Sequence, residues 1–191
     1  SSDRRSFPGV CARNPPASPF LSAALLPFAH TADKRPAPPA IPQQVAAPNP
    51  NIDMDAYVKS VREVAEHRKT RRLTEDDFIR MSQEDGVIVL DARSADKFRL
   101  MHVKGAINLN FSDITIESLK KTLPDKDAKI LIYCNNNFKN AKVPFPSKAP
   151  IASLNISTYI ALYNYGYRNV YELGPELDPA KSKIEFVRAG K

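Results

Sequence analysis

Short apolar runs of strand length, separated by segments with helical spacing, constrain the fold of this chain more than any other feature. The clearest are Val-Ile-Val-Leu at 87–90 and Lys-Ile-Leu-Ile-Tyr at 129–133. Apolar runs of this length are typical of strands that are covered on both faces. A further strand is predicted over 169–173, and a short one over 106–109. Strands alternating with helices indicate an α/β domain with a central, mostly parallel sheet flanked by helices on both faces.

Helical spacing predicts four helices around these strands. They span about 54–69, 75–83, 115–122 and 153–164. The first has a plausible N-cap in Asp53 or Asp55. Its apolar residues recur three and four apart and are Met54, Tyr57, Val58, Val61, Val64 and Ala65.

Two of the other helices have recognisable signals of their own. Thr74 and Asp77 resemble a capping box at the start of the second helix, with Asp in place of the usual Glu. In the helix over 115–122, Ile116 and Leu119 are expected to face inward.

Proline divides the chain into a tail and a domain. Of the 17 Pro, 11 fall within residues 1–50. Residues 33–50 are rich in Pro and Ala, and we interpret them as a linker of polyproline character. The regular patterning begins after this segment, so one folded domain is expected over 51–191.

The first 32 residues have the order of a targeting leader. Arg4, Arg5 and Arg13 precede an apolar stretch at 20–29, as in secretory signal peptides. We expect residues 1–32 to be a disordered leader and the domain to be exported to the periplasm. Import into an organelle, a cytoplasmic location and a tail without a targeting role are the alternatives. No run of 18 apolar residues occurs, so no membrane-spanning helix is predicted.

The charge of the chain is weak evidence about its partners. The formal net charge is +7, and the densest basic cluster is the run His-Arg-Lys-Thr-Arg-Arg at 67–72. Such a run can attract nucleic acid or acidic lipid. No aromatic residue interleaves with it, and no nucleic-acid motif accompanies it. We interpret the run as a solvated hinge between two helices and expect no nucleic-acid partner.

Cysteine usage leaves one candidate for chemistry. The two Cys, Cys11 and Cys134, are too few for a disulfide framework or a Cys-rich zinc module. Cys134 directly follows a predicted strand, at the sheet edge where ligands gather in open α/β folds. The polar residues at 135–140 can form a nest of inward-facing amides that stabilises a thiolate. A structural Cys buried at a strand end is the alternative.

A charged residue, Asp91, ends the strand predicted over 87–90. Asp91 cannot stay buried and unpaired there, and Arg93 can form a charge-assisted pair with it. His102 is expected to be a hydrogen-bonded brace. The other two His, His30 and His67, lie in the tail and the first helix, so no ligand cluster is evident. We therefore expect no metal and no cofactor.

The sequence around these residues resembles the rhodanese-like (sulfurtransferase) domain family. The most specific part is 91–108, which contains Asp-Ala-Arg, then an aromatic residue, then Met-His-Val-Lys-Gly-Ala-Ile-Asn. The resemblance continues in Tyr-Cys at 133–134 and Gly-Tyr-Arg-Asn-Val at 166–170. It covers about residues 73–178, and it implies a rhodanese-like domain over 51–191.

The resemblance implies that Cys134 carries sulfur as a persulfide. Its thiolate would take a sulfane sulfur from an anionic donor such as thiosulfate and pass it to cyanide or another thiol. The implied substrate-binding loop is Asn135, Asn136, Asn137, Phe138 and Lys139. Asp91, Arg93 and His102, by the charge pairing and bracing described above, are expected to give the site structural support. The family often has Arg at the position of Lys139 and directly after the Cys. Because Lys lacks the bidentate fork of Arg, thiosulfate turnover is expected to be weak.

Residues 140–150 look like an insertion between this loop and the following helix. The three Pro of the segment make it stiff and non-helical. We interpret it as a lid over Cys134 or a surface for a protein partner, and a plain surface loop is the alternative.

Other functions compete with sulfur transfer. Phosphatases on a related fold need Cys-x5-Arg, and no Arg follows Cys134 until Arg168, which argues against phosphate-ester hydrolysis. A rhodanese-like module without turnover, used for partner binding or thiol redox sensing, stays open. A redox pair of Cys11 and Cys134 would require that the leader stays attached.

Overall fold

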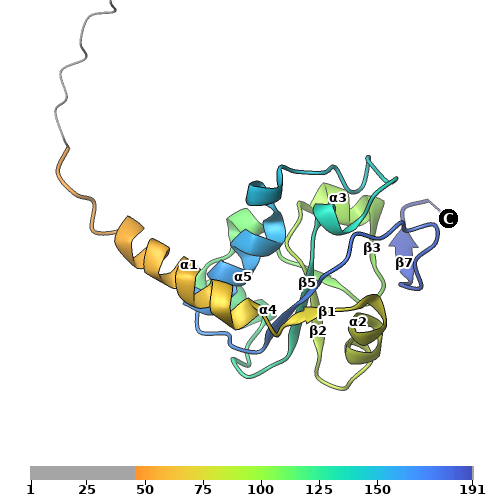
Figure 1. The fold of residues 1–191 in the computed structure, drawn as a ribbon, viewed down its shortest axis with the longest axis horizontal. Coiled ribbons are helices and arrows are strands. Elements are labelled where there is room, and N and C mark those ends of the chain that lie inside the picture. Colours follow the sequence, from red (N-terminus) through yellow and green to blue (C-terminus); the bar gives the residue numbers. More distant parts are fainter. Residues whose placement is uncertain (1–45, 191) are drawn as a thin grey trace, which may run out of the picture. The chain divides into compact units, whose positions relative to one another are not determined.

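The computed structural model describes residues 46–190 (Figure 1). The predicted leader over 1–32 lies outside the described residues, as does the predicted linker up to residue 45. Within the described part of the chain, no helix combines the length and apolar character that crossing a membrane requires.

A five-stranded parallel sheet forms the centre of the domain. Its strand order is β1-β6-β5-β2-β4, and every neighbouring pair is parallel. The strands are β1 (Arg72–Leu73), β2 (Ile88–Asp91), β4 (Ile107–Asn108), β5 (Ile130–Tyr133) and β6 (Val170–Leu173). The two apolar runs become the adjacent strands β2 and β5, so the predicted α/β class and mostly parallel sheet are confirmed.

Helices cover both faces of this sheet. They are α1 (Met54–Arg68), α2 (Glu75–Ser82), α3 (Ala95–Leu100), α4 (Ile116–Thr122) and α5 (Leu154–Asn164). On one face, Val64, Leu119 and Tyr159 of α1, α4 and α5 pack in one core cluster with strand residues. On the other, Phe78 of α2 packs in a second cluster with Val89 of β2. The predicted placement of helices on both faces of the sheet is therefore confirmed.

A small antiparallel sheet lies beside the second core cluster. It pairs β3 (Met101–Val103) with β7 (Phe186–Arg188). The hydroxyl of Tyr133 on β5 accepts a hydrogen bond from the backbone N–H of Val103, which links this sheet to the central one. This sheet was not predicted, because strands of three residues leave no alternating pattern long enough to recognise.

The predicted helix starts are only partly those observed. Asp53 is the N-cap of α1, and its side chain accepts from the N–H of Ala56. Thr74 accepts from the N–H of Asp77, as expected. The Asp77 carboxylate, however, accepts from the Thr74 hydroxyl at 2.8 Å. Only half of the predicted capping box therefore forms.

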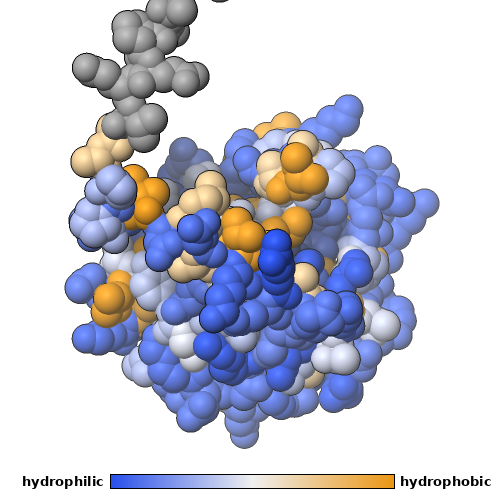
Figure 2. All heavy atoms as spheres, turned by 60° about the vertical axis from the view of Figure 1, so that its left-hand side comes forward, coloured by the Kyte–Doolittle hydropathy of each residue, from blue (hydrophilic) through white to orange (hydrophobic). Residues whose placement is uncertain are grey.

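Several apolar side chains of the predicted helices are exposed. Of the apolar residues that define the spacing of α1, only Val64 is buried, whereas Met54 is 68% exposed. Figure 1 shows the reason, because the N-terminal part of α1 extends beyond the sheet. The expectation for Ile116 is wrong, since it is 55% exposed, while Leu119 is fully buried. Exposed apolar groups appear as orange patches on the mostly hydrophilic face in Figure 2.

Candidate active site

Cys134 lies directly after β5, at the carboxyl edge of the sheet, and precedes the short turn η2 (Asn135–Asn137). The residue is 1% exposed, but it lines a cavity of about 220 Å³. Much of the wall is polar and consists of Arg68, Arg72, Asn136, Asn137, Ser153, Asn155 and Glu172. Cys134 therefore borders a polar cavity and is not enclosed by hydrocarbon alone.

Two hydrogen-bonding groups reach the sulfur. The Ser153 hydroxyl oxygen is 3.4 Å from Cys134 Sγ. The backbone N–H of Asn137 donates to the carbonyl oxygen of Cys134 at 3.2 Å and also faces the Cys134 side chain, as at a helix cap. Ser153 is the N-cap residue of α5 but makes no side-chain cap bond there, so its hydroxyl is available to the sulfur. Both donors can stabilise a thiolate by charge-assisted hydrogen bonds.

Two asparagine side chains hold the loop after Cys134 in place. Asn137 Oδ1 accepts from the N–H of Cys134 at 2.9 Å, and its Nδ2 donates to the carbonyl of Leu173 at 2.8 Å. Asn136 exchanges two hydrogen bonds with the backbone of Lys148, at 2.8 and 2.9 Å. Asn135 is buried, and its Oδ1 has no partner among the described residues. The turn is thus anchored to β6 and to the 140–150 segment.

Phe138 and Lys139 do not lie at the cavity. Phe138 is 1% exposed and belongs to the second core cluster, where its ring contacts Phe145 and Phe186. Lys139 is exposed, and its ammonium lies 3.7 Å from the carboxylate of Glu176. The structure therefore brings Asn136 and Asn137 of the predicted loop to the cavity with Cys134, but not Asn135, Phe138 or Lys139.

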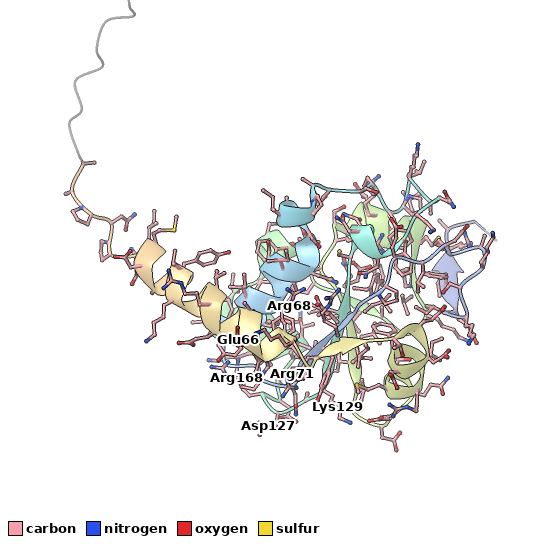
Figure 3. The ribbon with its side chains drawn as sticks, viewed as in Figure 1. Glu66, Arg68, Arg71, Asp127, Lys129 and Arg168 are labelled. Carbon is pink, nitrogen blue, oxygen red and sulfur yellow. The ribbon has the colours of Figure 1, made fainter. Side chains whose placement is uncertain are left out.

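The cationic groups of the cavity come instead from the basic run. Arg68 at the end of α1 donates to Glu172 Oε1 at 2.6 Å, and Arg72 Nε of β1 lies 3.4 Å from the same oxygen. Figure 3 labels Arg68 at the end of α1, and its guanidinium lies over the Tyr159 ring of α5. Burial raises the pKa of Glu172 above that of an ordinary glutamate, while both arginines lower it.

The interpretation of residues 67–72 as a solvated hinge holds only in part, because Arg68 and Arg72 both contact the buried Glu172, although the Arg72 side chain is 60% exposed. β1 pairs with β6 in a register that sets Arg72 opposite Glu172. A sequence signal for this pairing did exist. Glu172 is a charged residue inside a predicted buried strand, and a buried carboxylate needs a cationic partner.

Asp91 and Arg93 form the expected buried pair. Arg93 Nη2 is 2.5 Å from Asp91 Oδ2, and the two residues are 2% exposed or less. The guanidinium also donates to the carbonyls of Met101 and Pro144, both at 2.8 Å. Tyr133 donates to Asp91 Oδ2 at 2.5 Å, and burial with the Asp91 charge raises the pKa of Tyr133 well above that of free tyrosine. This network joins β2, β3, β5 and the 140–150 segment.

His102 lies away from the cavity. Its Nδ1 is 2.8 Å from the carbonyl of Phe98, and its ring stacks on the Phe98 ring at 3.8 Å between centroids. It thus braces the end of α3 against β3. Among residues 46–190, no three His, Cys, Asp or Glu side chains are grouped as a metal ion would require.

The 140–150 segment is packed against the domain. Phe145 is 1% exposed, and the Arg93 guanidinium lies 4.1 Å from the centre of its ring. Pro150, at the other end, lines the cavity beside Cys134. Val143 is 67% exposed and Ile151, just beyond the segment, is 92% exposed. Pro150 of the segment therefore forms part of the cavity wall, and Val143 presents an apolar side chain to solvent.

A family model described as a rhodanese-like domain matches residues 74–173. No curated protein matches the chain. Among solved structures, "rhodanese with anions from E. coli" is 21% identical over 53% of this chain and 98% of that chain, with a TM-score of 0.37. The BH2092 protein from Bacillus halodurans is 25% identical over 67% of this chain and 77% of that chain, with a TM-score of 0.39. An EanB variant in complex with hercynine is 16% identical over 64% of this chain and 28% of that chain, with a TM-score of 0.48.

Proposed function

The chain belongs to the rhodanese-like domain family, and on that basis we propose that it is a sulfurtransferase in which Cys134 carries a sulfane sulfur as a persulfide. The observation that carries the proposal is the polar cavity of about 220 Å³ that Cys134 lines at the carboxyl edge of the sheet. The Ser153 hydroxyl and the Asn137 N–H support it, because both can donate to a sulfur that bears negative charge.

In the first half-reaction, the Cys134 thiolate attacks the outer sulfur of thiosulfate. The thiolate electron pair forms the new S–S bond, the S–S bond of the donor breaks, and its electron pair leaves with sulfite. Cys134 then bears a persulfide anion. No oxidant is consumed, and no general base is needed when the thiolate is already formed.

In the second half-reaction, cyanide or a thiolate attacks the outer sulfur of the persulfide. The acceptor gains that sulfur as thiocyanate or as a new persulfide, and the electron pair of the broken bond returns to Cys134 as a thiolate. The proposed partners are thus a small anionic donor and a thiophilic acceptor, with no metal or cofactor in either step.

A module without turnover, used for partner binding or thiol redox sensing, is the second candidate. It is favoured by the burial of Cys134 and by the position of Lys139, which pairs with Glu176 outside the cavity. The two candidates differ in catalytic turnover, since a sensor would react once per molecule without passing sulfur to cyanide.

Thiocyanate formation from thiosulfate and cyanide by the full chain tests the proposal. Cys134→Ser should abolish turnover while leaving the circular dichroism and melting temperature close to those of the wild type. Cys11→Ser is the matched control and should retain turnover. Undiminished turnover in Cys134→Ser would overturn the proposal, as would a wild-type chain that forms no thiocyanate. Loss of the fold in Cys134→Ser would assign Cys134 a structural role.

A further inference from the structure

Two arginines of the basic run stand at the cavity beside Cys134, and neither belongs to the loop that follows the Cys. Arg68 lies in the last turn of α1, and Arg72 lies in the edge strand β1. Strand pairing fixes the second of these positions, because the register of β1 and β6 sets Arg72 opposite Glu172. Gly174 keeps the two strands close, since a Cβ there would lie 3.0 Å from the carbonyl oxygen of Leu73.

The charges around the cavity do not cancel. Glu172 is the only acidic residue among the described residues that line it, and its Oε1 faces both arginines, at 2.6 and 3.4 Å. The side chain of Arg72 is 60% exposed, while that of Glu172 is 2% exposed. Two guanidinium groups against one carboxylate leave one positive charge to face the Cys134 thiolate and an incoming anion, and the more exposed cation is Arg72.

Two other cationic residues, Arg93 and Lys139, are engaged elsewhere. Arg93 is buried and fully occupied by Asp91 and two carbonyls. Lys139 faces Glu176 outside the cavity. Within residues 46–190, positive charge at the cavity wall therefore comes from Arg68 and Arg72.

An anionic donor needs such a charge to approach a thiolate. Thiosulfate carries two negative charges and the attacking sulfur one, so the encounter is repulsive unless a cation lies close to both. A guanidinium also matches the oxygens of a sulfonate-like group with two parallel N–H donors, which an ammonium cannot do. Arg72 and Arg68 supply this fork from outside the Cys134 loop.

We propose that Arg72, oriented together with Arg68 by Glu172, is the anion-recognition residue of the Cys134 cavity and selects sulfur donors with an anionic leaving group. The selection of donors rests on the proposed sulfur transfer, whereas the preference of the cavity for anions does not. The anionic end of the donor lies against the edge strand β1, and its outer sulfur lies against Cys134.

The test compares two alkylating agents that differ in charge. In the full-length chain, the rate at which Cys134 reacts with iodoacetate, which is anionic, is divided by its rate with neutral iodoacetamide. Peptide mass spectrometry separates Cys134 from Cys11. This ratio measures the electrostatics of the cavity and does not require sulfur transfer. It therefore tests the anion preference of the cavity independently of the proposed function.

The three variants are expected to lower the ratio, to raise it and to leave it unchanged. Arg72→Gln removes the surplus positive charge and should lower the ratio roughly threefold to tenfold, a modest factor because solvent screens an exposed guanidinium. Glu172→Gln keeps a hydrogen-bond acceptor for Arg68, removes the negative charge, and should raise the ratio. Lys139→Gln is the matched control outside the cavity and should leave it unchanged.

A ratio that is the same in Arg72→Gln and the wild type would overturn the inference, as would a fall in Lys139→Gln equal to that in Arg72→Gln. If a variant does not fold, salt provides the second measurement on the wild-type chain. Raising the ionic strength should lower the ratio because the attraction is screened, and a ratio that does not change with salt would contradict the proposal.

Discussion

The hydroxyl of Ser153 lies 3.4 Å from the Cys134 sulfur and can donate a hydrogen bond to it. A hydrogen bond to a charged group contributes about 1.5–3 kcal/mol. Ser153→Ala should therefore slow persulfide formation at Cys134 roughly tenfold to hundredfold. Ser157→Ala is the matched control, because Ser157 lies on the same helix but lines a different cavity. An equal rate in Ser153→Ala and the wild type would remove this hydroxyl from the site.

The residues that could be predicted at the site are those tied to a recognisable strand end. Cys134 and Asp91 each follow an apolar run, and Arg93 is close enough in sequence to pair with Asp91. Ser153 could not be predicted, because it lies 19 residues beyond Cys134 and past the 140–150 segment. Lys139 lies outside the cavity, beside Glu176, and the burial of the preceding Phe138 in the core could not be predicted from the loop sequence.

Among the secondary-structure elements, the Asp91–Arg93 pair holds several segments together. Arg93 donates to Met101 of β3 and to Pro144 of the 140–150 segment as well as to Asp91. Asp91→Ala would leave a buried guanidinium without its counter-charge, and we expect it to lower the free energy of unfolding by about 3–5 kcal/mol in urea titrations.

Asp96→Ala is the matched control, because the Asp96–Arg99 pair is exposed, with side-chain exposures of 81% and 68%. It should change the free energy of unfolding by no more than about 1 kcal/mol. If the free energy of unfolding of Asp91→Ala equals that of Asp96→Ala, the buried pair does not stabilise the junction of these elements.

Most of the elements that could be predicted are long enough to show their period, and the two-residue β4, predicted as a short strand over 106–109, is the exception. The runs that became β2 and β5 and the spacing that became α1 and α5 were recognised. The two-residue β1, the three-residue β3 and β7 and the six-residue α3 are shorter than the windows in which a period can be detected. Their formation depends on partners distant in sequence, such as Glu172 for Arg72.

At the scale of the whole molecule, stability should fall in alkali. Burial raises the pKa of Tyr133 and of Tyr159 above that of free tyrosine. The folded state then retains these protons while the unfolded chain releases them. The contribution of the two tyrosines to the free energy of unfolding is therefore fully present below a pH of about 10 and declines above it. Each such group contributes a slope of up to about 1.4 kcal/mol per pH unit.

Tyr159→Phe separates this effect from the titration of lysines. Urea unfolding between pH 8 and pH 11 should show a shallower alkaline decline in Tyr159→Phe than in the wild type. The variant also loses the hydrogen bond from Tyr159 to the carbonyl of Val170, so the slopes are compared and not the absolute stabilities. Parallel slopes would show that Tyr159 ionises as easily in the fold as in the unfolded chain.

The account as a whole depends on whether Cys134 accepts a sulfur atom. After incubation of the full-length chain with thiosulfate, mass spectrometry of the peptide that contains Cys134 measures this directly. We predict a gain of about 32 Da, one sulfur atom, that is lost again on addition of cyanide. A peptide whose mass is unchanged, or that carries only sulfenic acid or a mixed disulfide, would contradict the account.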